Sequence, residues 1–146
     1  MELHAYIFFQ GNCQEALNFY AQALHGEIVE FHSYNENPEF AKSLPAEWHD
    51  KWMHAAFKAG EIFFMAADVP PAEADEYGAE VNYPTSPITL SLNFTSEEQE
   101  IEVFNQLATD GKVTMPLTDT FWGAKFGMLT DKFGIKWMFN YDKPQA

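Results

Sequence analysis

The chain has 146 residues, of which 47% are hydrophobic and 16% aromatic, so it can form a sizeable core and is not intrinsically disordered. Its formal net charge is -14, from 22 acidic and 8 basic residues, which excludes partners with phosphate backbones or anionic membrane surfaces. Cys13 is the only cysteine, so an intrachain disulfide is excluded and a reducing, cytoplasmic location is expected.

The first half of the chain predicts one strand, one helix and three further strands. Apolar and aromatic residues over 3–9 indicate the first strand. Asn12 and Glu15 have the spacing of a capping box at a helix start, and Gly26 is expected to end that helix in the left-handed conformation. The remaining strands are predicted over 27–34, 52–58 and 62–67, with a polar loop over 35–50.

The second half predicts the same order of elements. Strands are expected over 88–94, 112–117, 124–130 and 135–141. A helix begins near Ser96, whose spacing to Gln99 again suggests a capping box. Its predicted buried stripe is Ile101, Phe104 and Ala108, and its acidic residues, Glu100 among them, are expected to be solvated. Asp131 is expected to cap a hairpin through its side chain.

An internal repeat relates the two halves. Three residues recur 85 positions later: Phe9, Phe19 and Gly26 match Phe94, Phe104 and Gly111. The repeat predicts an α+β protein with two βαβββ modules paired around a central cleft, because short hairpins follow each helix. The predicted boundaries are 1–68 for the first module, 69–86 for a linker and 87–146 for the second module, in one compact domain.

Period-two alternation predicts which residues of the opening strands face the cleft. In the second copy the polar residues are Thr89, Ser91 and Asn93, while the alternating apolar residues pack under the helix. The offset of 85 then places His4 and Tyr6 in the cleft.

Two glycines relate the closing strands of the two modules. Matching Gly60 with Gly134 pairs Phe64 with Met138 and predicts that both face the cleft. Trp137, the neighbour of Met138, is then expected on the helix side.

The chain resembles the vicinal-oxygen-chelate superfamily, which includes glyoxalase I, bleomycin-resistance proteins and extradiol dioxygenases, and within it the PhnB-like branch. The residues that carry the resemblance are Tyr6-Ile-Phe-Phe-Gln-Gly-Asn12, Glu15-Ala16, Phe19-Tyr20, Asp119-Thr-Phe-Trp-Gly123, Phe126-Gly127, Thr130-Asp131-Lys132-Phe133-Gly134 and Trp137-Met138. Such proteins are often labelled demethylubiquinone methyltransferases, but this sequence has no glycine-rich nucleotide loop of a Rossmann methyltransferase.

The resemblance implies a homodimer, and it implies where metal ligands would lie in metal-using members. Those ligands come from the first and last strands of each module, which here correspond to His4, Phe64, Thr89 and Met138. Only His4 is an ordinary ligand for a first-row metal, because a phenyl ring cannot ligate, threonine is a poor neutral donor and methionine prefers soft copper(I). We therefore expect no metal and no other cofactor.

These observations favour a metal-independent protein that binds a small molecule, whose identity the sequence leaves open. The residues predicted to line its cleft are His4, Tyr6, His54, Phe64, Thr89, Ser91, Asn93, Trp122 and Met138. The alternative is an enzyme of the same superfamily, of lyase, isomerase or dioxygenase type. It would use His4 or His54 in metal-free acid–base work, or a displaced metal site at His54 or His32 with a nearby acid. A third possibility is a dimer that serves mainly as an interaction module. The sequence does not decide between these alternatives and identifies no catalytic residue.

Overall fold

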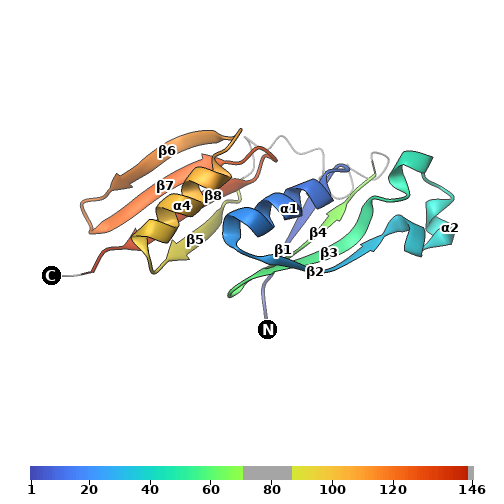
Figure 1. Ribbon diagram of the computed structural model, residues 1–146, viewed down its shortest axis with the longest axis horizontal. Helices are drawn as coiled ribbons and strands as arrows, with labels where there is room; N and C mark the ends of the chain where they lie inside the picture. Colours follow the sequence, from blue (N-terminus) through green and yellow to red (C-terminus); the bar gives the residue numbers. More distant parts are fainter. Residues whose placement is uncertain (71–86, 145–146) are drawn as a thin grey trace. The chain divides into compact units, whose positions relative to one another are not determined.

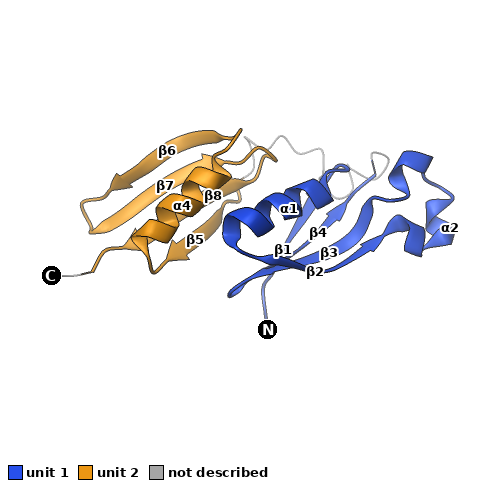
Figure 2. Ribbon diagram, viewed as in Figure 1, with its two compact units in different colours: residues 1–80 blue, residues 81–146 orange. Residues whose placement is uncertain are grey.

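The computed structural model describes residues 1–70 and 87–144, and its backbone forms two compact units, Met1–Glu80 and Val81–Ala146 (Figure 2). Each unit has the element order β-α-β-β-β around a four-stranded sheet, which confirms the predicted pair of βαβββ modules and the α+β class. Most of the predicted linker, 71–86, lies outside the described residues. In the described ranges, no helix combines the length and the apolar character needed to span a membrane.

The first unit places one helix on one face of its sheet (Figure 1). The sheet has the order β1-β4-β3-β2, with β1 parallel to β4 and the other neighbours antiparallel. Its elements are β1 (Ala5–Phe9), α1 (Cys13–Leu24), β2 (Glu27–Ser33), β3 (Trp52–Ala59) and β4 (Ile62–Asp68).

The segment between β2 and β3 contains three short helical turns where the sequence predicted only a loop. They are η1 (Tyr34–Glu36), α2 (Pro38–Ala41) and η2 (Ala46–Trp48). Proline favours the first position of a helix, and the Asn37 side chain accepts a hydrogen bond from the backbone N–H of Phe40. Local capping therefore gives this polar segment a defined conformation.

The core of the first unit lies between α1 and the sheet. Leu17 and Tyr20 of α1 are fully buried. The rings of Phe57 and Phe64 stack with centroids 4.8 Å apart, and Tyr20 meets Phe64 edge-on at 6.0 Å. Burying each of these side chains contributes roughly 1.5–3 kcal/mol to folding, which makes the helix-facing side of the sheet its hydrophobic side.

The start of α1 is held by a carboxylate from the far end of the module. Asp68, at the end of β4, accepts hydrogen bonds at Oδ1 from the backbone N–H groups of Gly11 and Cys13 and at Oδ2 from that of Trp52. The predicted cap was wrong, because the Asn12 side chain forms no capping bond with the described helix. A buried acceptor 57 residues away from Gly11 does the capping instead.

The two repeated glycines are required by close packing. Gly26 follows His25, which itself adopts the left-handed conformation with φ 54°, so the predicted role of Gly26 was wrong by one residue. A Cβ on Gly26 would lie 2.6 Å from the Phe57 ring. At the equivalent place in the second unit, a Cβ on Gly111 would lie 2.5 Å from the carbonyl oxygen of Thr130. In both modules, therefore, the chain passes from the helix to the next strand at a glycine that is in close contact with the sheet.

The second unit repeats this arrangement with the sheet order β5-β8-β7-β6. Its elements are β5 (Leu90–Phe94), α4 (Glu97–Leu107), β6 (Lys112–Asp119), β7 (Ala124–Thr130) and β8 (Lys136–Asp142). Ser96 caps α4 by accepting a bond from the N–H of Gln99, as predicted. The prediction for Asp131 is also confirmed, since its Oδ1 accepts bonds from the N–H groups of Phe133 and Ile135 in the turn before β8.

Of the three residues predicted for the buried stripe of α4, only Phe104 is buried, because Ala108 lies beyond the helix end as its partly buried C-cap. Ile101 is 40% exposed, whereas Glu100 is fully buried. The helix is oriented by three apolar residues at spacings of one and three, Val103, Phe104 and Leu107, and Glu100 precedes them on the same face. Both carboxyl oxygens of Glu100 are buried without a hydrogen-bond partner among the described residues.

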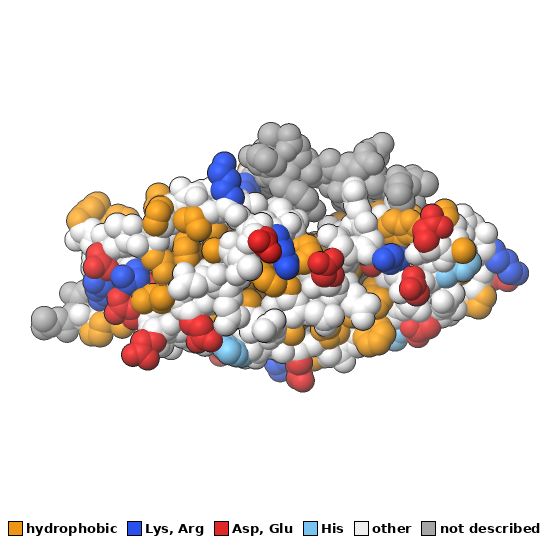
Figure 3. All heavy atoms as spheres, turned by 45° about the horizontal axis from the view of Figure 1, so that its top comes forward, with side chains coloured by type: hydrophobic (Ala, Val, Ile, Leu, Met, Phe, Trp, Pro, Cys, Tyr) orange, Lys and Arg blue, Asp and Glu red, His pale blue; other side chains and the backbone are white. Residues whose placement is uncertain are grey.

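Charged side chains of both signs occur on the surface of the protein. On the face shown in Figure 3, acidic and basic side chains are interspersed with hydrophobic ones. The net charge of -14 is therefore not one acidic patch on that face.

The Asp68 carboxylate predicts a large stability effect. Asp68→Ala leaves three backbone donors without their acceptor, and each such buried donor costs about 1–3 kcal/mol. We expect the free energy of unfolding, measured with urea, to fall by about 3 kcal/mol or more. Asp119→Ala, which removes an exposed carboxylate, should cost less than about 1 kcal/mol. Equal losses in the two variants would contradict the capping role.

The buried Glu100 predicts that stability falls between mildly acidic and mildly alkaline pH. Burial raises the pKa of Glu100 from 4.5 to about 7, against the attraction of Lys125. Because the folded state holds the proton more tightly, stability is complete below about pH 4.5 and is lost as the pH rises through 7. Glu100→Gln should therefore stabilise the protein by roughly 2 kcal/mol more at pH 8 than at pH 5.

Urea unfolding at the two pH values measures this difference. Glu98→Gln, on the exposed side of the same helix, is the matched control and should show no such dependence on pH. A Glu100→Gln effect that is the same at both pH values would show that the carboxyl stays ionised in the folded protein.

Candidate functional site

The face of the first sheet opposite α1 carries polar and aromatic side chains. On β1, Ile7 and Phe9 are 9% and 2% exposed beneath the helix, whereas Tyr6, which precedes Ile7, is 38% exposed on the other side. This alternation agrees with the face predicted for Tyr6 through the repeat. We refer to the side of each sheet away from its helix as the open face.

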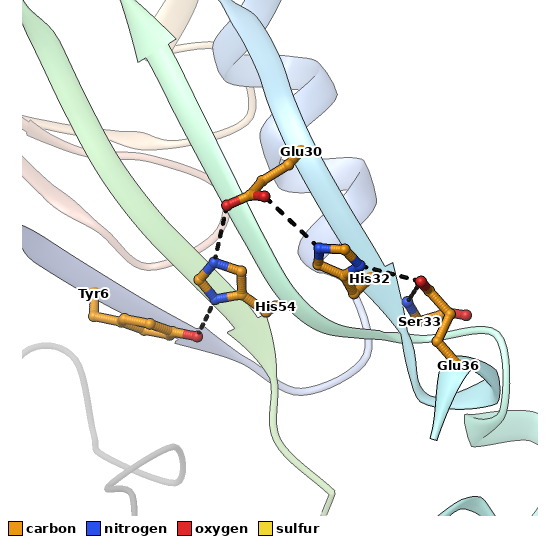
Figure 4. Close-up of polar contacts among 6 residues, drawn as sticks. All are labelled: Tyr6, Glu30, His32, Ser33, Glu36 and His54. Carbon is orange, nitrogen blue, oxygen red and sulfur yellow. Dashed lines mark hydrogen bonds and ion pairs between the residues drawn. The ribbon is translucent and has the colours of Figure 1, made fainter. Parts of the chain in front are cut away.

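Tyr6 and His54 form a hydrogen-bonded pair on this open face, from strands that are not neighbours in the sheet. The Tyr6 hydroxyl lies 2.8 Å from Nδ1 of His54, with β4 between their two strands (Figure 4). The Nε2 atom of His54 faces Oε1 of Glu30 at 3.6 Å. The imidazole therefore lies between a phenol and a carboxylate, an order suited to orienting the ring and relaying a proton.

The polar chain continues along β2 to the first turn of η1. The other oxygen of Glu30, Oε2, lies 3.7 Å from Nε2 of His32, whose Nδ1 lies 3.1 Å from Glu36 (Figure 4). Glu36 in turn accepts a hydrogen bond from the N–H of Ser33 and completes a capping box with it. His32 and His54 are directly opposite in the β2–β3 register, which is why their rings can share Glu30.

The two ends of this row of polar side chains, Tyr6 and the His32–Glu36 pair, differ in their protonation. Burial, followed by the charge of Cys13, raises the pKa of Tyr6, so this phenol is a hydrogen-bond donor at neutral pH. At the exposed end, the hydrogen bond and charge of Glu36 raise the pKa of His32. The pKa of Glu36 is lowered by the same contact. The inner end therefore holds a neutral phenol, and the outer end favours an ion pair.

A cavity of about 310 Å³ adjoins Tyr6 where the sheet meets the turns around α2. Its lining is mainly apolar and aromatic: Tyr6, Phe8, Tyr34, Phe40, Met53 and Val69. Tyr34 is held in place by donating a hydrogen bond of 2.6 Å to the carbonyl of Asp68 and by stacking on Phe40. Such a cavity has the size and character of a site for a small organic ligand.

The structure separates the other residues predicted in the first module. His4 lies beside the exposed Glu2, with its ring against Phe63 at 5.0 Å. The prediction that Phe64 faces the cleft is wrong, because this side chain is 3% exposed and packs against Tyr20 of α1 on the helix side.

The strand registers show why the glycine alignment misplaced Phe64. Ala5 pairs with Phe64, and Leu90, 85 residues after Ala5, pairs with Trp137. The closing strands are therefore related by an offset of 73, which makes Met65 the equivalent of Met138. The second module has one more residue in the turn before its closing strand. Ala59 pairs with Ile62 across two residues, whereas the N–H of Asp131 bonds to the carbonyl of Ile135 across three.

The remaining predicted residues belong to the second unit. Ser91 and Met138 are register partners on the open face of that sheet, where Asn93 accepts a hydrogen bond from Asn140. Thr89 immediately precedes β5, and Trp122 lies in the turn between β6 and β7, 59% exposed. A cleft shared with the first module stays a prediction.

The donor atoms at the superfamily's metal-ligand positions do not fit a first-row metal. With the register corrected these positions hold His4, Met65, Thr89 and Met138, of which only His4 is a suitable donor. In the described part of the chain no three His, Cys, Asp or Glu side chains are placed to hold an ion. At Glu30 the two imidazoles face different carboxylate oxygens, so their nitrogens do not converge on one point as a ligand set would.

Two βαβββ modules, each with one helix on one face of a four-stranded sheet and an open face on the other side, define the fold class of this chain. The family model of the Glyoxalase/Bleomycin resistance protein/Dioxygenase superfamily matches residues 2–139. The chain belongs to this superfamily.

Individual relatives extend the similarity over nearly the whole chain. Protein YjdN of Escherichia coli (strain K12) is 32% identical over 152 residues, covering 99% of this chain and 98% of its own. The crystal structure of protein PA1353 from Pseudomonas aeruginosa has 37% identity and a TM-score of 0.79, covering 99% of both chains. The PhnB protein from Bacillus cereus has 29% identity and a TM-score of 0.73, covering 97% of this chain and 99% of its own.

Sequence reasoning missed several residues of this site. Glu30 and Glu36 were not predicted, although Glu30 and His32 alternate correctly to share one face of β2. The cavity residues Tyr34, Phe40 and Met53 were also missed. Tyr34 and Phe40 lie in the helical turns η1 and α2, which the polar sequence did not reveal, and Met53 lies on β3 beside them.

The His32–Glu36 pair predicts a stability contribution confined to mildly acidic pH. The raised pKa of His32 gives a contribution that is complete below about pH 6.5 and is lost at higher pH. The lowered pKa of Glu36 gives one that is complete above about pH 4.5 and is lost at lower pH. Both are present between these values, so His32→Gln should lower Tm most near pH 5.5 and least near pH 8.

Thermal unfolding from pH 4 to 8 measures this profile. Glu36→Gln should reproduce its shape, because it breaks the same pair from the other side. A difference from wild type that stays constant across the range would exclude the ion pair as its cause.

Proposed function

We propose that this protein binds a small organic molecule in the cavity beside Tyr6, without using a metal ion. The cavity itself carries the proposal, because its aromatic lining ends at a phenol that is already oriented by His54. The lack of suitable donors at the metal positions of the superfamily supports the metal-independent form of the proposal.

The lining restricts the chemistry of the ligand. Phe8, Phe40 and Met53 offer apolar and polarisable surface, which suits a partly aromatic or apolar molecule. The carboxylate of Asp68 also lines the cavity, but its oxygens already accept three backbone hydrogen bonds. The polar groups placed to recognise the ligand are then the Tyr6 hydroxyl and the side-chain amide of Asn37, whose Oδ1 already accepts a hydrogen bond from the N–H of Phe40.

A panel of fluorinated aromatic fragments, observed by ¹⁹F NMR on the full chain, tests the proposal. We expect fragments that bind to lose affinity in Ala67→Leu, which fills the cavity, and by about five- to tenfold in Tyr6→Phe, which removes only the hydroxyl. Phe63→Leu changes an apolar residue on the same sheet outside the cavity and is the matched control. Binding that is unaffected by Ala67→Leu would place the ligand elsewhere and exclude the proposal.

A second candidate is an enzyme of the same superfamily, with His54 as its general base. The alignment of Glu30, His54 and Tyr6 favours it, since a carboxylate behind an imidazole orients the ring for proton transfer. An enzyme should convert a bound fragment, and His54→Gln should then abolish conversion while binding persists. Mass spectrometry of fragments after incubation, with wild type and His54→Gln in parallel, separates the two candidates.

The sheet edges support a proposed homodimer. The edge strands β2 and β6 expose apolar side chains, Val29 and Phe31 on the first and Val113 and Met115 on the second. Exposed edges of this kind are usually covered by a partner. Light scattering at micromolar concentration should give twice the chain mass of 16.7 kDa, and a monomer would exclude the dimer.

A further inference from the structure

We propose that the second module carries a separate site for a small oxyanion, built on a cross-strand row of Lys112, Thr130 and Lys136. Thr130 is the direct register partner of Lys112 on β6 and of Lys136 on β8. Residues directly opposite in antiparallel strands project from the same face, so the three side chains rise side by side with the hydroxyl in the middle. This site uses neither the residues nor the module of the proposed ligand cavity.

The row faces a hollow large enough for such an anion. A cavity of about 520 Å³ is lined by all three residues and by Thr114 and Lys132. Neighbouring cross-strand Cβ atoms are about 5 Å apart, which places the stems of Lys112 and Lys136 about two such steps apart. Flexible lysine side chains can converge from there on one anion above the Thr130 hydroxyl.

The charge of this hollow contrasts with that of the whole chain. All eight basic residues are lysines, among 22 acidic residues, and three of the eight line this one cavity. Three cations around one hollow give it a local charge opposite in sign to the net charge of -14, and this favours an anionic ligand.

The equivalent row in the first module has a different pattern. There Glu27 is opposite Lys58, and Lys58 is opposite Phe63. The lone cation of that row has a carboxylate as its cross-strand partner, whereas in the second module a threonine separates two cations. The lysine row is therefore a property of the second module and does not follow from the repeated fold.

Two carboxylates also line the hollow, and they act differently. Asp131 is 3% exposed, and its oxygens accept bonds from the N–H groups of Phe133 and Ile135 and from the indole N–H of Trp137. Its charge is thus shared among donors of the turn. Asp110 lies in a left-handed turn with φ 58° and opposes an anion.

Titration of the ¹⁵N-labelled full chain with inorganic phosphate at constant ionic strength tests the site. We expect saturable shifts of the amide signals of Gly111, Thr130 and Gly134, with those of Tyr6 and His54 unmoved. Lys112→Gln and Lys136→Gln should each weaken phosphate binding about fivefold or more, because each removes a charge-assisted hydrogen bond. Acetate in a parallel titration distinguishes a phosphate-type from a carboxylate-type ligand by which anion binds more tightly.

Two further variants test the charge dependence of phosphate binding, one expected to tighten it and one expected to leave it unchanged. Asp110→Asn removes the opposing charge, keeps a residue that tolerates positive φ, and should tighten phosphate binding. Lys42→Gln removes an exposed lysine paired with Glu39 outside the hollow and should leave the affinity unchanged. The proposal is overturned if the shifts do not saturate, or if Lys112→Gln and Lys136→Gln weaken binding no more than Lys42→Gln. The result is independent of fragment binding beside Tyr6.

Discussion

The first module depends on the buried carboxylate of Asp68. Its two oxygens accept backbone hydrogen bonds from Gly11 and Cys13 at the start of α1 and from Trp52 at the start of β3. Burial alone raises the pKa of this carboxyl, and the three donors oppose that rise. The carbonyl of the same residue accepts the hydroxyl of Tyr34. One residue at the end of β4 therefore joins the helix, two strands and the wall of the candidate cavity.

The second module replaces this connection with a more local one. Asp131 binds the turn before β8 and the indole of Trp137, all within six residues of itself. The start of α4 is left to Ser96, a neighbour in sequence. The modules thus share a fold while using their buried aspartates differently, and this difference accompanies the division of their open faces. The first has an aromatic cavity beside a histidine, and the second has a hollow lined by lysines.

The repeat predicted the opening strands well because their offset is undisturbed by loops. Tyr6 and Ser91 both lie on open faces, and the repeated glycines both lie at close contacts. The closing strands were harder, since a turn longer by one residue shifts a strand register by one and reverses its faces. Phe64 was therefore assigned to the open face, although Met65 is the residue that corresponds to Met138.

The sequence by itself determined the two modules, the order of their elements and the chemistry of most metal-ligand positions. These depend on periodicity, on repeated residues and on side-chain type, which are local properties. Only the tertiary structure decided that Asp68 caps α1, that Glu100 is buried, and that Glu30 connects His54 with His32. Each of these depends on how strands far apart in the chain are aligned, and on which face of a helix the whole core selects.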